Sequence, residues 1–154
     1  MFALTRKTDY ALVALTALAR PAGEPASARA LADKLNLPGP ALRNILKSLA
    51  AANLLRSTQG PFGGYTLAQP ASQITIEAVV EAIEGPLALT PCCSDVFDAD
   101  ACKREDSCLI KDAVRDLHQR LRRYLTETTI DDLQRASLQE PKTGVSAQLT
   151  TSRP

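Results

Sequence analysis

Residues 28–67, ARALADKLNLPGPALRNILKSLAAANLLRSTQGPFGGYTL, decide the fold of this chain. Their middle carries apolar side chains at the i, i+3, i+4 and i+7 spacing of a buried helix face, namely Leu42, Ile45, Leu46 and Leu49. Pro40 suits the first turn of that helix, and Ser27 can cap a shorter amphipathic helix before it. Residues 36–39, NLPG, connect the two. Two short helices across a tight, glycine-containing turn predict a helix-turn-helix.

A β-hairpin is predicted directly after these helices. Residues 54–58 and 65–67 have the composition of strands, and the connection 59–64, QGPFGG, is a tight turn. A hairpin in this place is a wing, whose glycines let the backbone take positive φ or approach DNA closely, and whose tip can enter a minor groove. The alternative is a surface hairpin that only closes the core.

The face of the 40–49 helix opposite the apolar stripe is polar. Its side chains can donate hydrogen bonds to phosphates or base edges from a helix laid in a major groove, although an ordinary solvated helix face would look the same. We expect DNA contacts from Arg43, Asn44, Lys47 and Ser48 in the helix and from Arg56, Gly60, Phe62, Gly63 and Gly64 in the hairpin.

The charge distribution supports a nucleic-acid partner for the first half. The net charge of the 154 residues is only +1, yet residues 1–70 hold eight Lys or Arg against three acids, and residues 71–154 hold ten against fourteen. Enzyme motifs such as a P-loop, a dinucleotide-binding glycine motif or a nucleophile elbow do not occur, so we expect no enzyme. We expect no signal peptide in the first residues and find no segment long enough to span a membrane, so the expected location is cytoplasmic and reducing.

Helices are also predicted on either side of this region. Thr8 can cap a first helix that ends before Pro21, and Thr75 can cap another with Ile76, Val79, Val80 and Ile83 buried. After residue 109 an apolar seam, made of Ile110, Val114, Leu117, Leu121 and Tyr124, predicts a long helix that packs against another helix. The fold class is therefore mainly α with a small β-hairpin.

Three regions follow from this pattern. Residues 1–72 form a winged helix-turn-helix, residues 73–133 hold the seam helix and the segment before it, and residues 134–154 form a flexible tail. Thr129 and Asp132 make a capping box for a last short helical turn. We interpret the seam helix as a dimerisation helix, since a palindromic site needs two copies; the alternative is packing on its own domain.

All four cysteines lie in residues 90–108, TPCCSDVFDADACKREDSC, the cysteine segment. In a reducing compartment clustered cysteines bind metal or respond to oxidants more often than they form permanent disulfides. No C-x2-C pair occurs, which disfavours structural zinc, whereas thiolates also bind iron-sulfur clusters. Cys108 is expected at the start of the seam helix, capped by Asp106 or Ser107. Rival readings are a cluster-free thiol switch and a protein-interaction module with structural zinc.

Four runs of the sequence resemble the IscR and NsrR family of winged-helix transcription regulators. They are LTRKTDYAL at 4–12, the stretch from residue 28 to 57, GPFGGYTLAQPA at 60–71, and ITIEAVVEAIEGPLAL at 74–89, with spaced cysteines after them. The resemblance covers about residues 1–133. It implies a homodimer that binds near-palindromic promoter DNA, and in cluster-binding members it implies a sensor of iron-sulfur status, nitric oxide or redox state. We expect a repressor, with the role of an activator left open.

The same resemblance implies a ligand set. Aligned on the Glu-Gly-Pro segment, Cys92 rather than Cys93 matches the first cysteine of the family, and Cys102 and Cys108 match the second and third. The fourth ligand stays open, because the histidine of one branch is Lys111 here, while the carboxylate that another branch supplies from the partner subunit matches Asp9, and Cys93 is a local candidate. The choice between 2Fe-2S and 4Fe-4S also stays open. Arg43 departs from the Glu of well-known members.

Overall fold

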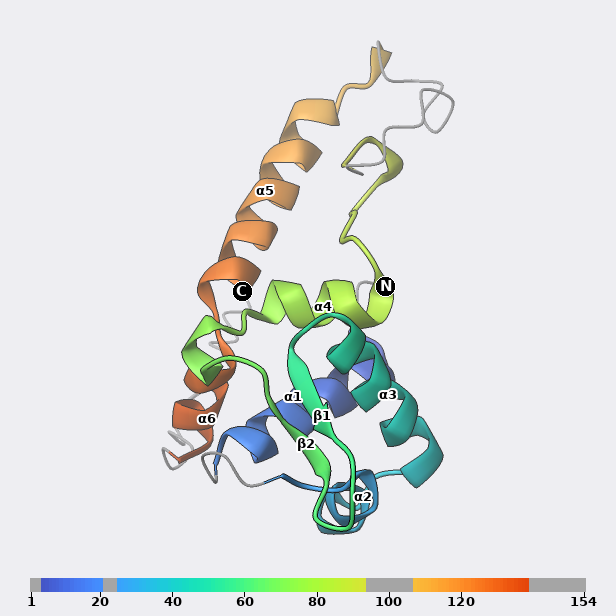
Figure 1. Ribbon diagram of the computed structural model, residues 1–154. Helices are drawn as coiled ribbons and strands as arrows, with labels where there is room; N and C mark the ends of the chain where they lie inside the picture. The colour runs from blue at the N-terminus through green and yellow to red at the C-terminus, as the bar shows by residue number, and fades with distance from the viewer. Residues whose placement is uncertain (1–3, 21–24, 94–106, 139–154) are drawn as a thin grey trace, which may run out of the picture.

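The computed structural model describes residues 4–20, 25–93 and 107–138 of the chain. Helices make up most of it, with one antiparallel hairpin, as the sequence pattern predicts (Figure 1). The elements in order are α1 (Arg6–Ala19), α2 (Ala28–Leu35), α3 (Gly39–Ala51), β1 (Leu55–Thr58), β2 (Gly64–Leu67), η1 (Ala71–Gln73), α4 (Ile76–Glu84), η2 (Pro91–Cys93), α5 (Lys111–Glu127) and α6 (Ile130–Leu138).

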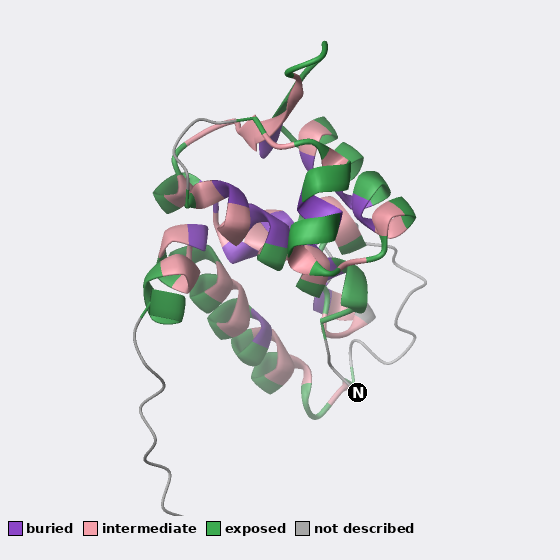
Figure 2. Ribbon diagram, turned by 90° about the horizontal axis from the view of Figure 1, so that it is seen from below, coloured by how far each residue is buried: buried purple, intermediate pink, exposed green. Residues whose placement is uncertain are grey.

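The core lies where α1, α3, α4 and α6 meet (Figure 2). The apolar stripe of α3 is buried as expected, with exposed fractions of 0 to 4%, and α1 contributes Ala11, Ala14, Leu15 and Leu18. Ile130 of α6 is fully buried in the same cluster. Since burying a Leu or Ile side chain contributes about 1.5–3 kcal/mol, this shared cluster ties the helix-turn-helix to the segments on both sides of it.

The first helix begins one turn earlier than predicted. Thr5, not Thr8, is the N-cap, and its hydroxyl accepts hydrogen bonds from the backbone N–H groups of Lys7 and Thr8. Thr8 is fully buried, and its hydroxyl donates to a Glu84 carboxylate oxygen at 2.5 Å. The prediction that Thr8 caps this helix was wrong. Both threonines have a hydroxyl that can cap a helix, but the hydroxyl of Thr8 is bonded to Glu84 of α4 instead.

The predicted caps of α2, α4 and α6 are observed, while α6 itself is longer than expected. Ser27 and Thr75 accept the expected backbone hydrogen bonds at the starts of α2 and α4. Thr129 and Asp132 form the capping box of α6. This helix continues to Leu138, so residues 134–138 are helical where a flexible tail was expected; residues 139–154 lie outside the described part.

The helix α5 extends away from the helices around the core, with the η2 turn beside it (Figure 1). It begins at Lys111, three residues after Cys108, and Ile110 occupies the cap position without a side-chain cap. The expected start at Cys108, capped by Asp106 or Ser107, was therefore wrong. Its seam is not buried within the chain, since Ile110, Leu117 and Tyr124 are 61%, 58% and 68% exposed. Among the described residues, no helix is long and apolar enough to cross a membrane.

Candidate DNA-binding face and cysteine site

The four predicted polar residues of α3 share one open face of the helix. Arg43, Asn44, Lys47 and Ser48 are all exposed, opposite the buried stripe. The turn before α3 depends on Asn36, which ends α2 with a left-handed backbone at φ 52°. Its neighbour Leu37 donates a backbone hydrogen bond to Ala32 at 3.0 Å. This turn aims α3 across α2, and the exposed face, called the recognition face below, has the placement of a helix that reads a major groove.

The wing is held near its turn by the chain before α2. Tyr65 of β2 exchanges two backbone hydrogen bonds with Ala26, of 2.9 and 3.1 Å. Gly64 permits this approach, because a Cβ on it would lie 2.6 Å from the Ala26 carbonyl carbon. At the tip, Gly60 takes a positive φ of 116°, and Phe62 is 93% exposed. The glycines thus shape the hairpin, and their close contact with DNA stays a prediction.

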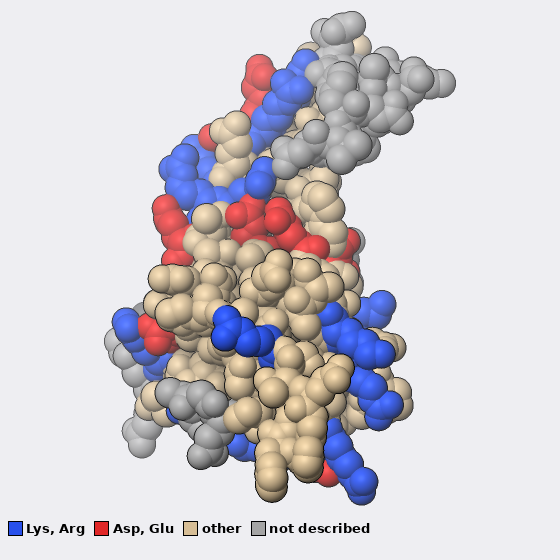
Figure 3. Space-filling view, viewed as in Figure 1, with Lys and Arg blue, Asp and Glu red and all other residues tan. Residues whose placement is uncertain are grey.

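The surface near α3 is basic. Figure 3 shows Lys and Arg along the edge of the lower body and a band of Asp and Glu where that body meets α5. The exposed side chains of Arg43, Lys47 and Arg56 come from α3 and β1. A helix with an open polar face, a neighbouring wing and a basic surface together form a surface suited to duplex DNA.

The adjacent cysteines Cys92 and Cys93 differ in burial and in their contacts. Cys93 is 8% exposed, and its thiol points to the carbonyl oxygen of Val114 in α5 at 4.0 Å, whereas Cys92 is half-buried. The Thr90 hydroxyl lies 3.1 Å from the Cys92 sulfur and 3.3 Å from the Cys93 sulfur. Cys108 is half-buried, and no disulfide involves these three residues. Cys102 lies outside the described residues.

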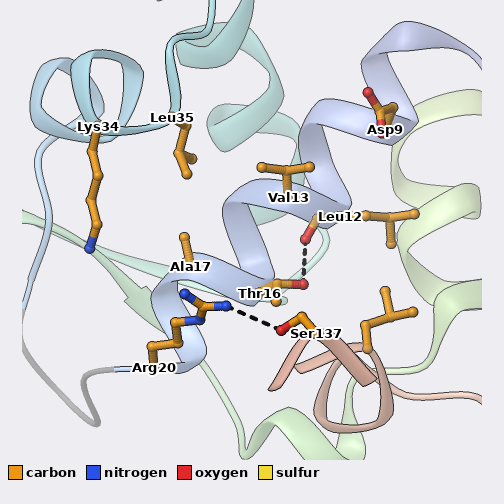
Figure 4. Close-up of a pocket in the computed structure, with 10 residues that line it drawn as sticks. Asp9, Leu12, Val13, Thr16, Ala17, Arg20, Lys34, Leu35 and Ser137 are labelled. Carbon is orange, nitrogen blue, oxygen red and sulfur yellow. Dashed lines mark hydrogen bonds between the residues drawn. The ribbon is translucent and has the colours of Figure 1, made fainter. Parts of the chain in front are cut away.

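Asp9 lines a groove whose other lining residues include no cysteine. It is exposed on the outer face of α1, and this groove of about 560 Å³ is called the α1 groove (Figure 4). The groove walls come from α1, α2 and α6, with Leu12, Val13, Leu35 and Leu133 as apolar lining. In residues 4–20, 25–93 and 107–138, no three His, Cys, Asp or Glu side chains are grouped to hold a metal ion.

Two polar clusters that sequence reasoning missed link the helices. In the first, Glu84 at the end of α4 accepts hydrogen bonds from the hydroxyls of Thr5 and Thr8 in α1. These bonds, that of Thr5 first, lower the pKa of Glu84 below its ordinary value. The carboxylate therefore stays ionised at neutral pH and attaches the first turn of α1 to the residue before Gly85.

The second cluster joins α4 to α5. Glu77 accepts hydrogen bonds from the Thr126 hydroxyl at 2.5 Å and the Arg122 guanidinium at 2.7 Å. The Thr126 bond and then the Arg122 bond and charge lower the pKa of Glu77, although burial opposes the shift. His118, one turn earlier in α5, is 6% exposed, and its Nδ1 has no hydrogen-bond partner among the described residues. The spacing of Glu77 and Arg122 in the sequence gives no sign of this contact.

Known proteins with a similar sequence or fold are transcriptional regulators. Residues 4–136 match the family model Rrf2, described as iron-dependent transcriptional regulator. A helix-turn-helix-type transcriptional regulator of Synechocystis is 35% identical over 136 residues, covering 84% of this chain and 86% of its own. The regulator IscR of Serratia proteamaculans is 29% identical, covering 84% and 77%. The solved structure of CymR, the global cysteine regulator of B. subtilis, has a TM-score of 0.68 at 27% identity and covers 91% and 100%.

Proposed function

The chain belongs to the Rrf2 family of transcriptional regulators and is a DNA-binding regulator, and on that premise we propose that the cysteine segment controls its grip on DNA. The regulator acts as a homodimer on near-palindromic promoter DNA. An iron-sulfur cluster held by Cys92, Cys102 and Cys108 sets the position of the cysteine segment. Loss or modification of that cluster by oxidants or nitric oxide is the signal.

The observation that carries this proposal is a series of contacts that runs from Cys93, the neighbour of the proposed ligand Cys92, to α3. The η2 turn packs on α5 through Cys93 and Val114. The helix α5 is joined to α4 through Arg122 and Glu77, and α4 is joined to α1 and α3 in the core. A shift of the cysteine segment therefore reaches the helix that would lie in the major groove.

The thiols that the structure describes fit a cluster in their chemistry. The three described cysteines, Cys92, Cys93 and Cys108, are free of disulfides. Thiolates are the usual protein ligands of iron-sulfur clusters. Cys92 is the more open of the adjacent pair, which supports it over Cys93 as the first ligand. When bound, the cluster supplies a redox-active group whose loss frees its cysteines.

In a dimer, a change in the cysteine segment can alter the affinity for DNA. The exposed apolar side chains of α5 suit packing against a second copy. Two recognition helices must lie about one DNA turn, roughly 34 Å, apart to occupy both half-sites. A displaced α5 alters that spacing and weakens binding. Asp9 is exposed on α1, in a groove whose lining includes no cysteine, which suits a fourth ligand donated to the partner subunit.

The test combines anaerobic purification with absorption spectra, iron and sulfide counts and DNA affinity. We expect a coloured protein that Cys92→Ser and Cys108→Ser bleach. The matched control is Cys93→Ser, which removes a thiol facing α5 and should leave the colour. Asp9→Ala should destabilise the cluster; an intact spectrum would move the fourth ligand to Cys93 or to an external group.

A cluster-free thiol switch is the second candidate. It is favoured by the adjacent Cys92 and Cys93, whose sulfurs share the Thr90 hydroxyl. A colourless protein without iron whose DNA affinity changes on thiol oxidation would support this candidate and overturn the cluster. Zinc found in place of iron would overturn both.

A further inference from the structure

We propose that Lys7, in the first turn of α1, contacts the DNA phosphate backbone on the side of α3 that has no cation of its own. The inference rests on the proposed DNA-binding orientation of the recognition face and adds a contact from outside the helix-turn-helix and the wing. Lys7 lines one pocket of about 300 Å³ together with Asn44 and Ser48 of α3 and Ile83 of α4. A phosphate-binding residue of α1 is thus placed beside the recognition face.

The recognition face is charged along one edge only. Arg43 and Lys47 are four residues apart and lie one above the other on α3. Asn44 and Ser48 stand in the same relation on the other edge, and they are neutral. A helix in the major groove has a phosphate backbone on each side. Arg43 and Lys47 can bind the phosphates of one DNA strand. Toward the phosphates on the other side of the groove, α3 presents only neutral hydrogen-bond donors.

Lys7 supplies the missing charge at the neutral edge. Its side chain is exposed, and it lines the same pocket as Asn44 and Ser48. A lysine ammonium is a compact, flexible charge that suits a phosphate oxygen. Phosphate contacts of this kind fix the register of a protein on the duplex without reading its sequence.

The first turn of α1 is held in place for such a contact. Thr5 caps the helix with its side-chain oxygen and donates its hydroxyl hydrogen to Glu84, and Thr8 donates to the same carboxylate oxygen. Lys7 lies between these two threonines in the sequence, so the cluster fixes its backbone relative to α4.

An alternative role for Lys7 is to neutralise Glu84, since the positive charge of Lys7 contributes to the lowered pKa of Glu84. Two hydroxyls already donate to Oε1 of that carboxylate, and among the described residues no ion pair within 4 Å involves Lys7. The ammonium is therefore available to an anion that approaches the neutral edge of α3.

The test measures DNA affinity against salt concentration by fluorescence anisotropy, with duplexes selected from a randomised pool by the wild-type protein. Each lost phosphate contact lowers the slope of log K against log salt by about 0.9. Lys7→Ala should therefore lower the slope by about 0.9 per subunit, or about 1.8 for a dimer. The ranking of the duplexes should stay the same, because phosphates carry no sequence information. Lys7→Arg should keep the wild-type slope.

Arg135→Ala is the matched control. It removes the same charge from α6, where Arg135 is paired with Asp131 at 2.6 Å, and it should leave the slope unchanged. Far-UV circular dichroism checks that each variant is folded. A Lys7→Ala slope equal to that of the wild type, or a slope lowered equally by Arg135→Ala, overturns the assignment of Lys7. Wild-type protein that binds no duplex overturns both this inference and the proposed function.

Discussion

Replacing Glu77 by Gln removes one of the charges that attach α5 to α4. Glu77 is the acceptor for both Thr126 and Arg122, and its side chain is 14% exposed in the pair with Arg122. The amide of Gln keeps the size of the side chain but accepts these hydrogen bonds more weakly. We expect a less stable attachment of α5, with the core around α3 intact.

The magnitude follows from the two contacts. A hydrogen bond to a charged group contributes about 1.5–3 kcal/mol when buried, whereas an exposed ion pair contributes about 0.2–1 kcal/mol. Arg122 is 35% exposed in this pair, and it still has Glu81 at 3.9 Å. Loss of the Arg122–Glu77 ion pair should therefore cost about 0.2–1 kcal/mol, the range for exposed pairs. The Thr126 bond weakens without being lost. Together we expect about 1–2 kcal/mol less free energy of unfolding.

Urea unfolding followed by circular dichroism measures this loss, with Arg120→Gln as the control, because Arg120 forms only an exposed pair with Asp116. The pKa of Glu77 is lowered in the folded state, so its contribution is complete above the unfolded pKa, about 4.3. It is lost as the pH falls through the lower, folded pKa. The difference between wild type and Glu77→Gln should therefore persist from pH 7 to about 5 and shrink in acid. Equal stabilities at pH 7, or a difference that grows in acid, would refute the reasoning.

Three further outcomes are expected. Leu46→Ala should lower the free energy of unfolding by about 2–5 kcal/mol, because Leu46 is fully buried; a loss below about 1 kcal/mol would contradict its place in the core. Arg43→Ala should weaken specific DNA binding by about 1–3 kcal/mol and relax the preference at one base position, and an unchanged preference in a binding-site selection would exclude a base contact. Leu117→Glu, on the exposed seam of α5, should shift sedimentation from dimer to monomer; a surviving dimer would place the interface elsewhere.

Much of the fold could be predicted because its signals are local. The stripe of α3 and the caps Ser27 and Thr75 depend on helical spacing and on backbone donors within three residues. The same logic located the recognition face, since the side opposite a buried stripe is open. It was wrong for Thr8 and for the start of α5, where a contact from another element, or the lack of a capping side chain, decided the boundary.

The candidate cysteine site could be predicted only in part. Clustering of the cysteines marked residues 90–108 as a candidate metal or redox site, yet spacing alone did not distinguish Cys92 from Cys93 as the more open thiol. The direction of the Cys93 side chain toward Val114 depends on how η2 packs against α5, and no periodic pattern in the sequence records that packing.

The sequence by itself determined the winged helix-turn-helix, its polar reading face and the clustering of the cysteines, because helical spacing, turn residues and residue chemistry are local properties. Only the tertiary structure decided which distant groups meet. Glu84 with Thr5 and Thr8, Glu77 with Arg122 and Thr126, and Lys7 beside Asn44 are separated by tens of residues in the sequence. Their pairing follows from the way the shared core brings α1, α3, α4 and α5 together, and that packing depends on the whole chain at once.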